Sequence, residues 1–362
     1  MLKVGIIGAG LYGLNHFTAF AQRAKYLGDI KLVGFAEVDA QRRAAMEKQY
    51  AVPAYADYRE LIEREHPDAL TVVTPDHLHY NIVMDCLERR IPVLVEKPLS
   101  TSLEEAKAMA KAADTYETLL QVDFHKRFDP YHIDLKFRIQ EGTLGKIQYG
   151  YCWMEDVLRV GTDMIGKKSW NNQGSPGWFL AIHMIDLSYW LMDCPKPVSV
   201  SAFGFKGKLK SMGIDIYDSM KIQVAYDNGT AITYDTTVVL PNSHESVVRQ
   251  GVKMVGTEGF MEVNSQYRGA RGCSTNTGME TPNLGMTFRD YDKDGNLIKK
   301  GYFADSIYDF VENLKYLQNG HSLAELKGKY ASGWQGVDSV KVGVAMHESA
   351  MKNGITIDIS NW

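Results

Sequence analysis

The chain has 362 residues, of which 45% are hydrophobic and 23% are charged, and its net charge at pH 7 is −4. This length is too great for one ordinary core and predicts about two domains. The composition is that of a globular protein, which argues against disorder or a fibrous chain. A small negative net charge excludes the basic surface that nucleic acid or an anionic membrane requires.

The four cysteines lie dozens of residues apart and never form a C-x-x-C pair. This spacing disfavours a zinc site or a disulfide framework and is typical of a reducing cytosol. No apolar signal segment precedes the first predicted strand. The most apolar later stretch, residues 178–192, contains His183 and Asp186 and is too short and too polar to span a bilayer. We therefore expect a cytoplasmic protein.

The first third of the chain alternates short β-branched runs with helical patterns, which is typical of a parallel sheet with crossover helices. An α/β fold is therefore predicted for this part. The predicted strands cover residues 3–8, 30–36, 69–74, 93–96 and 119–124. The predicted helices between them cover residues 12–26, 40–49, 77–89 and 103–113.

The pattern changes near Phe128-Asp129-Pro130, where a helix over 130–141 precedes strands without helices between them. Asp227-Asn228-Gly229 predicts a hairpin turn, because Asn-Gly readily adopts positive φ angles. This part is predicted to be α+β with an antiparallel sheet. Its predicted strands cover residues 146–157, 197–206, 219–226, 230–240 and 246–255. A long excursion or lid over 264–300 and two helices over 305–318 and 334–352 are expected to follow.

The strongest local motif is VGIIGAGLYG, residues 4–13, a G-x-G-x-x-G sequence between a predicted strand and a predicted helix. Gly8 permits the tight turn, Gly10 lets backbone amides approach a pyrophosphate, and Gly13 allows close helix–strand packing. A glycine-rich turn without a ligand is the alternative, which the strand–turn–helix context disfavours. The dinucleotide-binding residues predicted in this loop are Gly8, Ala9, Gly10, Leu11 and Tyr12.

Glu37 ends the second predicted strand, where an acidic side chain accepts hydrogen bonds from the adenosine ribose hydroxyls. It would also repel a 2′-phosphate, and Asp39 adds to that repulsion. Arg42 and Arg43 are expected to face solvent on the following helix. The sequence therefore favours NAD over NADP, the alternative being two solvated carboxylates at a strand end.

Several further motifs resemble those of the Gfo/Idh/MocA oxidoreductases, the glucose–fructose oxidoreductase and inositol dehydrogenase family. TPDHLH (74–79) is similar to the family's T-P-x-x-x-H, and EKP (96–98) is similar to its most specific signature. VDFHKRFDP (122–130) resembles its V-G-F-x-R-R-F-D-P, with Asp123 in place of the usual Gly. The resemblance extends along the whole chain through IHMID (182–186) and ESAMKNGITIDI (348–359).

The resemblance implies an N-terminal Rossmann domain over 1–126 and, over 127–362, a C-terminal α+β domain with a large open antiparallel sheet for substrate binding and oligomerisation. Family members bind NAD(H) or NADP(H), act on sugars, glycosides or cyclitols, and commonly form homo-oligomers through the sheet. It further implies that Thr74, Pro75, His79, Glu96 and Lys97 lie at the cofactor.

Lys97 and His183 are the predicted catalytic residues. Lys97 follows a strand at the sheet edge where open α/β folds bind ligands, and it can donate to a substrate hydroxyl or ketone oxygen. An ion pair with Glu96 is the structural alternative. His183 suits a general base, because its unperturbed pKa is near operating pH. Its structural alternative is pairing with Asp186, three residues further along the helix.

One position departs from the family pattern. The dehydrogenases usually carry an Asp four residues before the helix His, whereas this chain has Phe179 there. Asp163, Asp156 and Asp123 are candidate substitutes, and our hypothesis is that Asp163 is the third catalytic residue. The departure also keeps open a non-catalytic dinucleotide-binding regulator.

Four residues are predicted to line the substrate cleft, because aromatic rings stack on pyranose rings and charged groups bind hydroxyls: His125, Arg127, Trp153 and Trp170. The alternative is that these side chains only pack within the protein. His77 and His79 form H-x-H, but two ligands without a third are a weak metal signal, and no metal is predicted. The predicted activity is NAD-dependent oxidation of a secondary hydroxyl of a sugar, glycoside or cyclitol. The substrate expected first is a glucoside that is oxidised at a ring carbon such as C3. Inositol dehydrogenation is the alternative.

Overall fold

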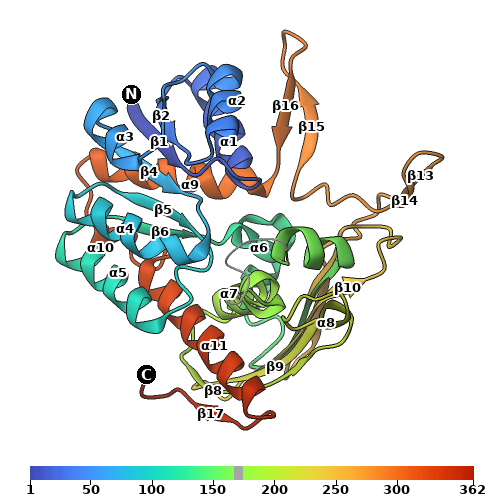
Figure 1. The fold of residues 1–362 in the computed structure, drawn as a ribbon. Coiled ribbons are helices and arrows are strands. Elements are labelled where there is room, and N and C mark those ends of the chain that lie inside the picture. Colours follow the sequence, from blue (N-terminus) through green and yellow to red (C-terminus); the bar gives the residue numbers. More distant parts are fainter. Residues whose placement is uncertain (167–173) are drawn as a thin grey trace. The chain divides into compact units, whose positions relative to one another are not determined.

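The structure is a computed structural model that describes residues 1–166 and 174–362 (Figure 1). The chain divides into two compact units, the first of residues 1–125 and 287–337 and the second of residues 126–286 and 338–362. The first change of unit, between residues 125 and 126, lies beside the predicted domain boundary at 126. Residues 287–337, however, group with the first unit, because helix α9 (Tyr302–Gln318) packs on α1 (Gly13–Tyr26).

The first unit is built on a six-stranded sheet in the order β3-β2-β1-β4-β5-β6, and every pairing is parallel. This confirms the predicted Rossmann class. Five of the strands, β1, β2, β4, β5 and β6, have almost every side chain buried, as expected of a sheet covered on both faces. The strands are β1 (Leu2–Ile7), β2 (Ile30–Ala36), β3 (Ala54–Tyr55), β4 (Ala69–Val72), β5 (Val93–Glu96) and β6 (Leu120–Asp123).

The helices of this unit follow the predicted ones closely, with one addition. Strand β3 and helix α3 were not predicted from the sequence. Strand β3 is only two residues long, and helix α3 is a short, highly charged segment. The helices beside α1 and α9 are α2 (Ala40–Tyr50), α3 (Tyr58–Glu65), η1 (Asp76–Leu78), α4 (His79–Glu88), α5 (Leu103–Thr115), η2 (His125–Phe128, extending into the second unit) and α10 (Leu323–Leu326).

The core of the first unit explains why α9 belongs to it. Phe303, Ile307 and Phe310 of α9 are fully or almost fully buried in one cluster with Phe17 and Phe20 of α1. An amphipathic helix of 17 residues contributes this apolar stripe. Burying that stripe, at about 25 cal/mol per Å² of apolar surface, favours the return of the chain to the first unit.

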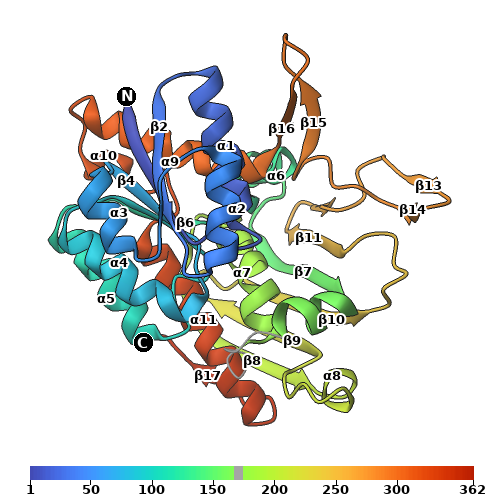
Figure 2. The same ribbon diagram turned by 45° about the horizontal axis from the view of Figure 1, so that its top comes forward.

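The second unit contains a seven-stranded sheet in the order β12-β11-β7-β10-β9-β8-β17 (Figure 2). Every pairing is antiparallel except β7–β10, so the sheet is mixed rather than wholly antiparallel as predicted. The meander β8-β9-β10 sets the direction of β10, and β7 then pairs with its last strand. The strands are β7 (Ile147–Val157), β8 (Pro197–Phe205), β9 (Ser219–Tyr226), β10 (Ala231–Leu240), β11 (Val248–Gly256), β12 (Phe260–Asn264) and β17 (Ile357–Asp358).

The predicted turn at residues 227–229 joins β9 to β10, and Gly229 there has a φ of +85°. The predicted excursion over 264–300 contains two short hairpins, one assigned to each unit. They are formed by β13 (Gly272–Ser274) with β14 (Gly278–Glu280), and by β15 (Phe288–Tyr291) with β16 (Leu297–Lys300).

Helix α7 (Ile182–Leu191) packs on one face of this sheet, where the Ser188 hydroxyl lies 2.6 Å from the Tyr234 hydroxyl of β10. A π-helical segment, η5 (Gly177–Ala181), leads into it. The other helices are α6 (Pro130–Gln140), η3 (Val160–Ile165), α8 (Lys208–Ser211) and α11 (Gly333–Met351). Among the described residues, no helix combines the length and apolar character needed to cross a bilayer.

One close contact tests the packing of the second unit. An alanine Cβ at Gly343 would lie 2.1 Å from the Trp178 ring, which stacks on His347. We predict that Gly343→Ala lowers the free energy of unfolding by about 1–3 kcal/mol, measured in urea, because the clash outweighs the gain in helix propensity. Gly259→Ala is the control, because no atom lies within 4 Å of its Cβ position. Stabilisation by Gly343→Ala would contradict this packing.

Candidate active site

The glycine loop between β1 and α1 can be formed only by glycine at two of its positions. Gly8 has a φ of +99°, and a Cβ there would lie 2.5 Å from the carbonyl oxygen of Val73. A Cβ at Gly13 would lie 2.6 Å from the carbonyl oxygen of Gly8. The first and third glycines of the motif therefore allow the loop to pack against β4 and against itself.

Gly10 differs, because no atom lies within 4 Å of its Cβ position. It borders open space at the start of α1, where free backbone N–H groups and the positive end of the helix dipole favour a phosphate. Leu11, beside it, is exposed. The space beside this helix N-terminus fits the pyrophosphate of a dinucleotide, as the motif predicts.

Glu37 lies at the end of β2 and is held from three sides. Its Oε2 accepts a hydrogen bond from the Ala9 N–H at 2.9 Å and lies 3.2 Å from the Arg42 guanidinium, while its Oε1 accepts from the Asp39 N–H at 2.9 Å. Arg42 was expected to face solvent. Its guanidinium is instead half-exposed and pairs with the carboxylate of Glu37. Arg43 donates to the carbonyl oxygen of Glu37. Glu37 is thus fixed beside the glycine loop.

The segments after β4 and β5 are joined by His79. Its buried imidazole lies 3.0 Å from the carbonyl oxygens of both Thr74 and Pro98. The H-x-H pair does not converge on one point, because His77 is exposed and His79 is buried in this contact. Lys97, half-buried, lies directly after β5. Thr74, Pro75, His79, Glu96 and Lys97 therefore belong to the same carboxyl edge of the parallel sheet as the glycine loop.

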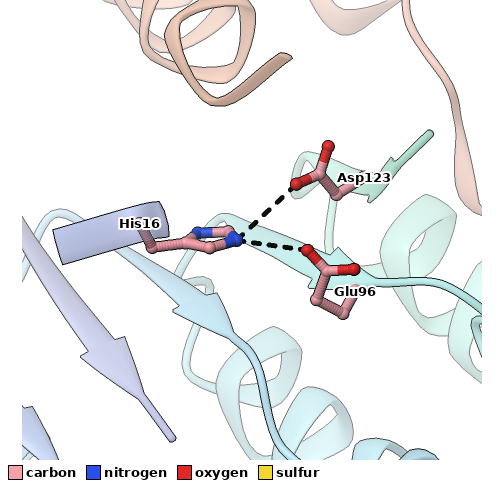
Figure 3. A group of neighbouring side chains, drawn as sticks. All are labelled: His16, Glu96 and Asp123. Carbon is pink, nitrogen blue, oxygen red and sulfur yellow. Dashed lines mark hydrogen bonds and ion pairs between the residues drawn. The ribbon is translucent and has the colours of Figure 1, made fainter. Parts of the chain in front are cut away.

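A buried cluster that the sequence analysis did not predict lies at this edge (Figure 3). His16 Nε2 lies 3.2 Å from Oε1 of Glu96 and 3.6 Å from Oδ2 of Asp123. Burial raises the pKa of Glu96 to about 7 and lowers that of His16 to about 4. Burial and the nearby Glu96 charge raise the pKa of Asp123 well above its usual value. The one feature of the sequence that could have indicated this cluster is a histidine, His16, three residues after Gly13.

His125, predicted to line the substrate cleft, is buried among aromatic rings of the first unit. Its Nδ1 lies 2.8 Å from the Tyr12 hydroxyl, and its ring stacks on Tyr302 at 5.6 Å between centroids. Burial, followed by the charge of Glu96, raises the pKa of Tyr12 well above its usual value. These contacts of His125 link the glycine loop to α9.

In the second unit, His183 lies on α7 and is 7% exposed. Asp186, the partner considered for His183, receives two hydrogen bonds from Arg127, at 2.6 and 2.9 Å, in a buried bidentate pair. Burial raises the pKa of Asp186, although Arg127 opposes that rise. Phe179 packs against an apolar cluster that includes Ile165.

The remaining predicted site residues lie in different surroundings. Asp163 is exposed on η3, 3.2 Å from the Thr162 hydroxyl. Trp153 stacks on Tyr151 on the sheet face opposite α7, because Cys152 between them pairs with Tyr234, which contacts α7. Trp153 is thus on the other face of the sheet from the helix that carries His183. Trp170 lies outside the described residues.

Comparisons with known proteins decide the family. The model of the oxidoreductase family with an NAD-binding Rossmann fold, GFO_IDH_MocA, matches residues 2–124, and the GFO/IDH/MocA C-terminal domain matches residues 132–262. The chain belongs to the Gfo/Idh/MocA family. It is therefore an NAD(P)-dependent oxidoreductase with an NAD-binding Rossmann domain, and the alternative of a non-catalytic regulator is set aside.

Similar proteins include the inositol 2-dehydrogenase of Rubrobacter xylanophilus, 27% identical over 72% of this chain and 71% of that protein. The D-glucoside 3-dehydrogenase of Escherichia coli is 26% identical over 68% of this chain and 73% of that protein. Among solved structures, the scyllo-inositol dehydrogenase of Lactobacillus casei with bound NAD(H) and scyllo-inositol has a TM-score of 0.80 at 17% identity, covering 100% of both chains. This last likeness supports the fold.

The open space at Gly10 predicts a selective loss of dinucleotide binding. Gly10→Val should raise the dissociation constant for NAD at least about tenfold, because its side chain would occupy the space beside the helix N-terminus. The unfolding midpoint should change little, because nothing lies within 4 Å of the added Cβ. Calorimetric titration with NAD and a thermal melt measure the two effects. Unchanged NAD affinity would contradict the predicted position of the pyrophosphate.

The Arg127–Asp186 pair predicts a loss of stability when one partner is removed. Arg127→Met should lower the free energy of unfolding by about 3–5 kcal/mol, because Asp186 is left buried without a countercharge. The double variant Arg127→Met/Asp186→Leu should recover most of that loss in the same urea experiment. A single variant with wild-type stability and a raised KM would instead support the predicted contact of Arg127 with substrate.

Proposed function

We propose that the protein is an NAD-dependent dehydrogenase that oxidises a secondary hydroxyl of a sugar, glycoside or cyclitol to a ketone. The observation that carries this proposal is the position of Lys97, a half-buried lysine at the same carboxyl edge of the parallel sheet as the glycine loop and Glu37. A lysine at that edge can contact the oxygen of a polyol whose carbon faces the cofactor. The two relatives acting on inositol and on D-glucosides support this substrate class.

Each residue has a distinct proposed task. The glycine loop holds the pyrophosphate, Glu37 accepts from the ribose hydroxyls, and bound NAD supplies the two-electron acceptor. Lys97 donates a hydrogen bond to the substrate oxygen and stabilises the negative charge that develops there. His183 accepts the hydroxyl proton. Asp163 is proposed to orient His183, and an Asp163→Asn variant with wild-type kcat would remove it from this scheme.

The substrate proposed first is a glucoside oxidised at a ring carbon such as C3. The aromatic-rich region of residues 151–190 supports a site for a bulky aglycone. Inositol dehydrogenation is the second candidate, supported by the inositol 2-dehydrogenase relative. We also propose a cytoplasmic enzyme that forms homo-oligomers through its C-terminal sheet, because that sheet exposes Tyr149, Phe203 and Phe205.

A substrate panel tests this function. The purified chain is incubated with NAD and, separately, inositols, free sugars and glucosides, while the absorbance of reduced nicotinamide is followed and products are analysed. We expect turnover with at least one glucoside or inositol. Lys97→Met and His183→Asn should each lower kcat at least about 100-fold, while NAD still binds.

Two exposed residues of the same types serve as controls. Lys111→Met and His321→Asn should leave kcat unchanged, because Lys111 is exposed on α5 and His321 is exposed in the loop between α9 and α10. Product analysis detects a retained cofactor that recycles between two sugars, which absorbance alone would miss. Tight NAD binding without any product from the whole panel would refute the proposed substrate class.

A further inference from the structure

The His16–Glu96–Asp123 cluster is a concentration of ligand atoms that the proposed reaction does not use in full. Its members come from α1 and from the ends of β5 and β6, and their side chains point toward one another (Figure 3). They are 0%, 7% and 1% exposed. Among the described residues, this is the group of three His, Cys, Asp or Glu side chains whose donor atoms converge.

The two distances from the imidazole of His16 are close to the distance between two ligands of one metal ion. The imidazole Nε2 lies 3.2 and 3.6 Å from one oxygen of each carboxylate, and all three donor atoms lie within 4.8 Å of one another. Two ligands of a tetrahedral Zn²⁺ ion, each bound at about 2.0–2.1 Å, are about 3.3 Å apart. A cation could therefore be bound with only small shifts of these side chains.

A second observation concerns Asp123 alone. Neither of its carboxylate oxygens has a hydrogen-bond partner among the described residues, although the side chain is almost completely buried. The hydroxyl of Ser306, which donates to the carbonyl oxygen of Phe303 at 3.4 Å, lies close enough to lower the pKa of Asp123, while the neighbouring Glu96 raises it. Burying a carboxylate without a donor or a countercharge is strongly unfavourable. The charge of Lys97 acts on Glu96, whereas the group that faces Asp123 at 3.6 Å is the imidazole of His16.

We propose that His16, Glu96 and Asp123 bind one divalent transition-metal ion, Zn²⁺ or a cation of similar preference such as Mn²⁺ or Fe²⁺. Two carboxylates and a neutral imidazole balance a charge of +2. One nitrogen and two oxygen donors suit these ions, whereas Ca²⁺ takes six to eight oxygen ligands and Cu(I) prefers sulfur. Water can take the remaining position, as in zinc sites with three protein ligands.

The ion would cross-link three segments far apart in the sequence. It would hold the first turn of α1, which follows the glycine loop, against the ends of β5 and β6. Because Glu96 directly precedes Lys97, the same ion would also fix the backbone from which Lys97 extends. The ion acts as a structural cross-link and takes part in no redox step. Its binding does not depend on the substrate class proposed above.

Elemental analysis of the full chain tests the site. The protein is produced without a polyhistidine tag in medium containing Zn²⁺, Mn²⁺ and Fe²⁺, desalted, and measured by inductively coupled plasma mass spectrometry. We expect about one ion per wild-type chain and less than about a tenth of that in Asp123→Asn and His16→Gln. His321→Gln is the matched control, since the exposed His321–Glu325 pair offers only two ligand groups, 3.3 Å apart.

Thermal melts give a readout that does not depend on metal retained through purification. Adding Zn²⁺ to chelator-treated wild-type protein should raise Tm by at least about 5 °C, because an ion that binds only the folded chain stabilises it by mass action. Asp123→Asn, which keeps the shape of the side chain, should show no such rise, and NAD binding verifies that it is folded. If Asp123→Asn does not fold, His16→Gln serves in both measurements.

Two results would overturn the proposal. The first is a wild-type chain that holds no more metal than the folded variant, both as purified and after Zn²⁺ is added. The second is an infrared carbonyl band of a protonated carboxyl that disappears in Asp123→Asn, which would show that Glu96 and Asp123 share a proton instead. Neither result depends on turnover, so a failure here is distinct from a failure of the substrate panel.

Discussion

The parallel direction of the six strands in the first unit is the constraint on which the candidate site depends. Parallel strands place all their carboxyl ends at one edge of the sheet, so the residues that follow them meet there. The glycine loop follows β1, Glu37 follows β2, Thr74 comes after β4, and Lys97 follows β5. Residues that lie far apart along the chain are thereby gathered at one edge.

The sequence was sufficient to predict this sheet because nearly all of its strands are buried on both faces and read as continuous apolar runs. It was not sufficient to predict where residues 287–337 belong. The polar segment before α9 carries no sign of its partner in the sequence, and contacts such as the packing of Phe303 and Phe310 on α1 assign the helix to the first unit. The parallel β7–β10 pairing was missed for a similar reason, since it joins strands separated by several helices and two other strands.

For the predicted site residues too, features set by neighbouring residues could be predicted, whereas contacts between distant parts of the chain could not. Glycine geometry and the acidic end of β2 are local properties, and both are found in the structure. The face on which Trp153 lies could not be predicted, because Cys152 and Trp153 are both buried and the alternation of exposure along β7 is broken there. Arg127 and Asp186 pair across 59 residues, and no sequence spacing indicates that contact.

Asp123 connects these two kinds of information. As a single residue it is only a departure from a glycine in a family-like motif, and it gained significance when the structure placed it beside His16 and Glu96. A carboxylate in place of a glycine adds a negative charge to a site that already buries Glu96, so the fold must supply a positive charge or a proton there. Because Glu96 precedes Lys97, whichever partner neutralises the pair also sets the field in which the Lys97 ammonium works. A cation in the cluster would reduce the attraction of Lys97 to Glu96 and leave the ammonium available to a substrate oxygen.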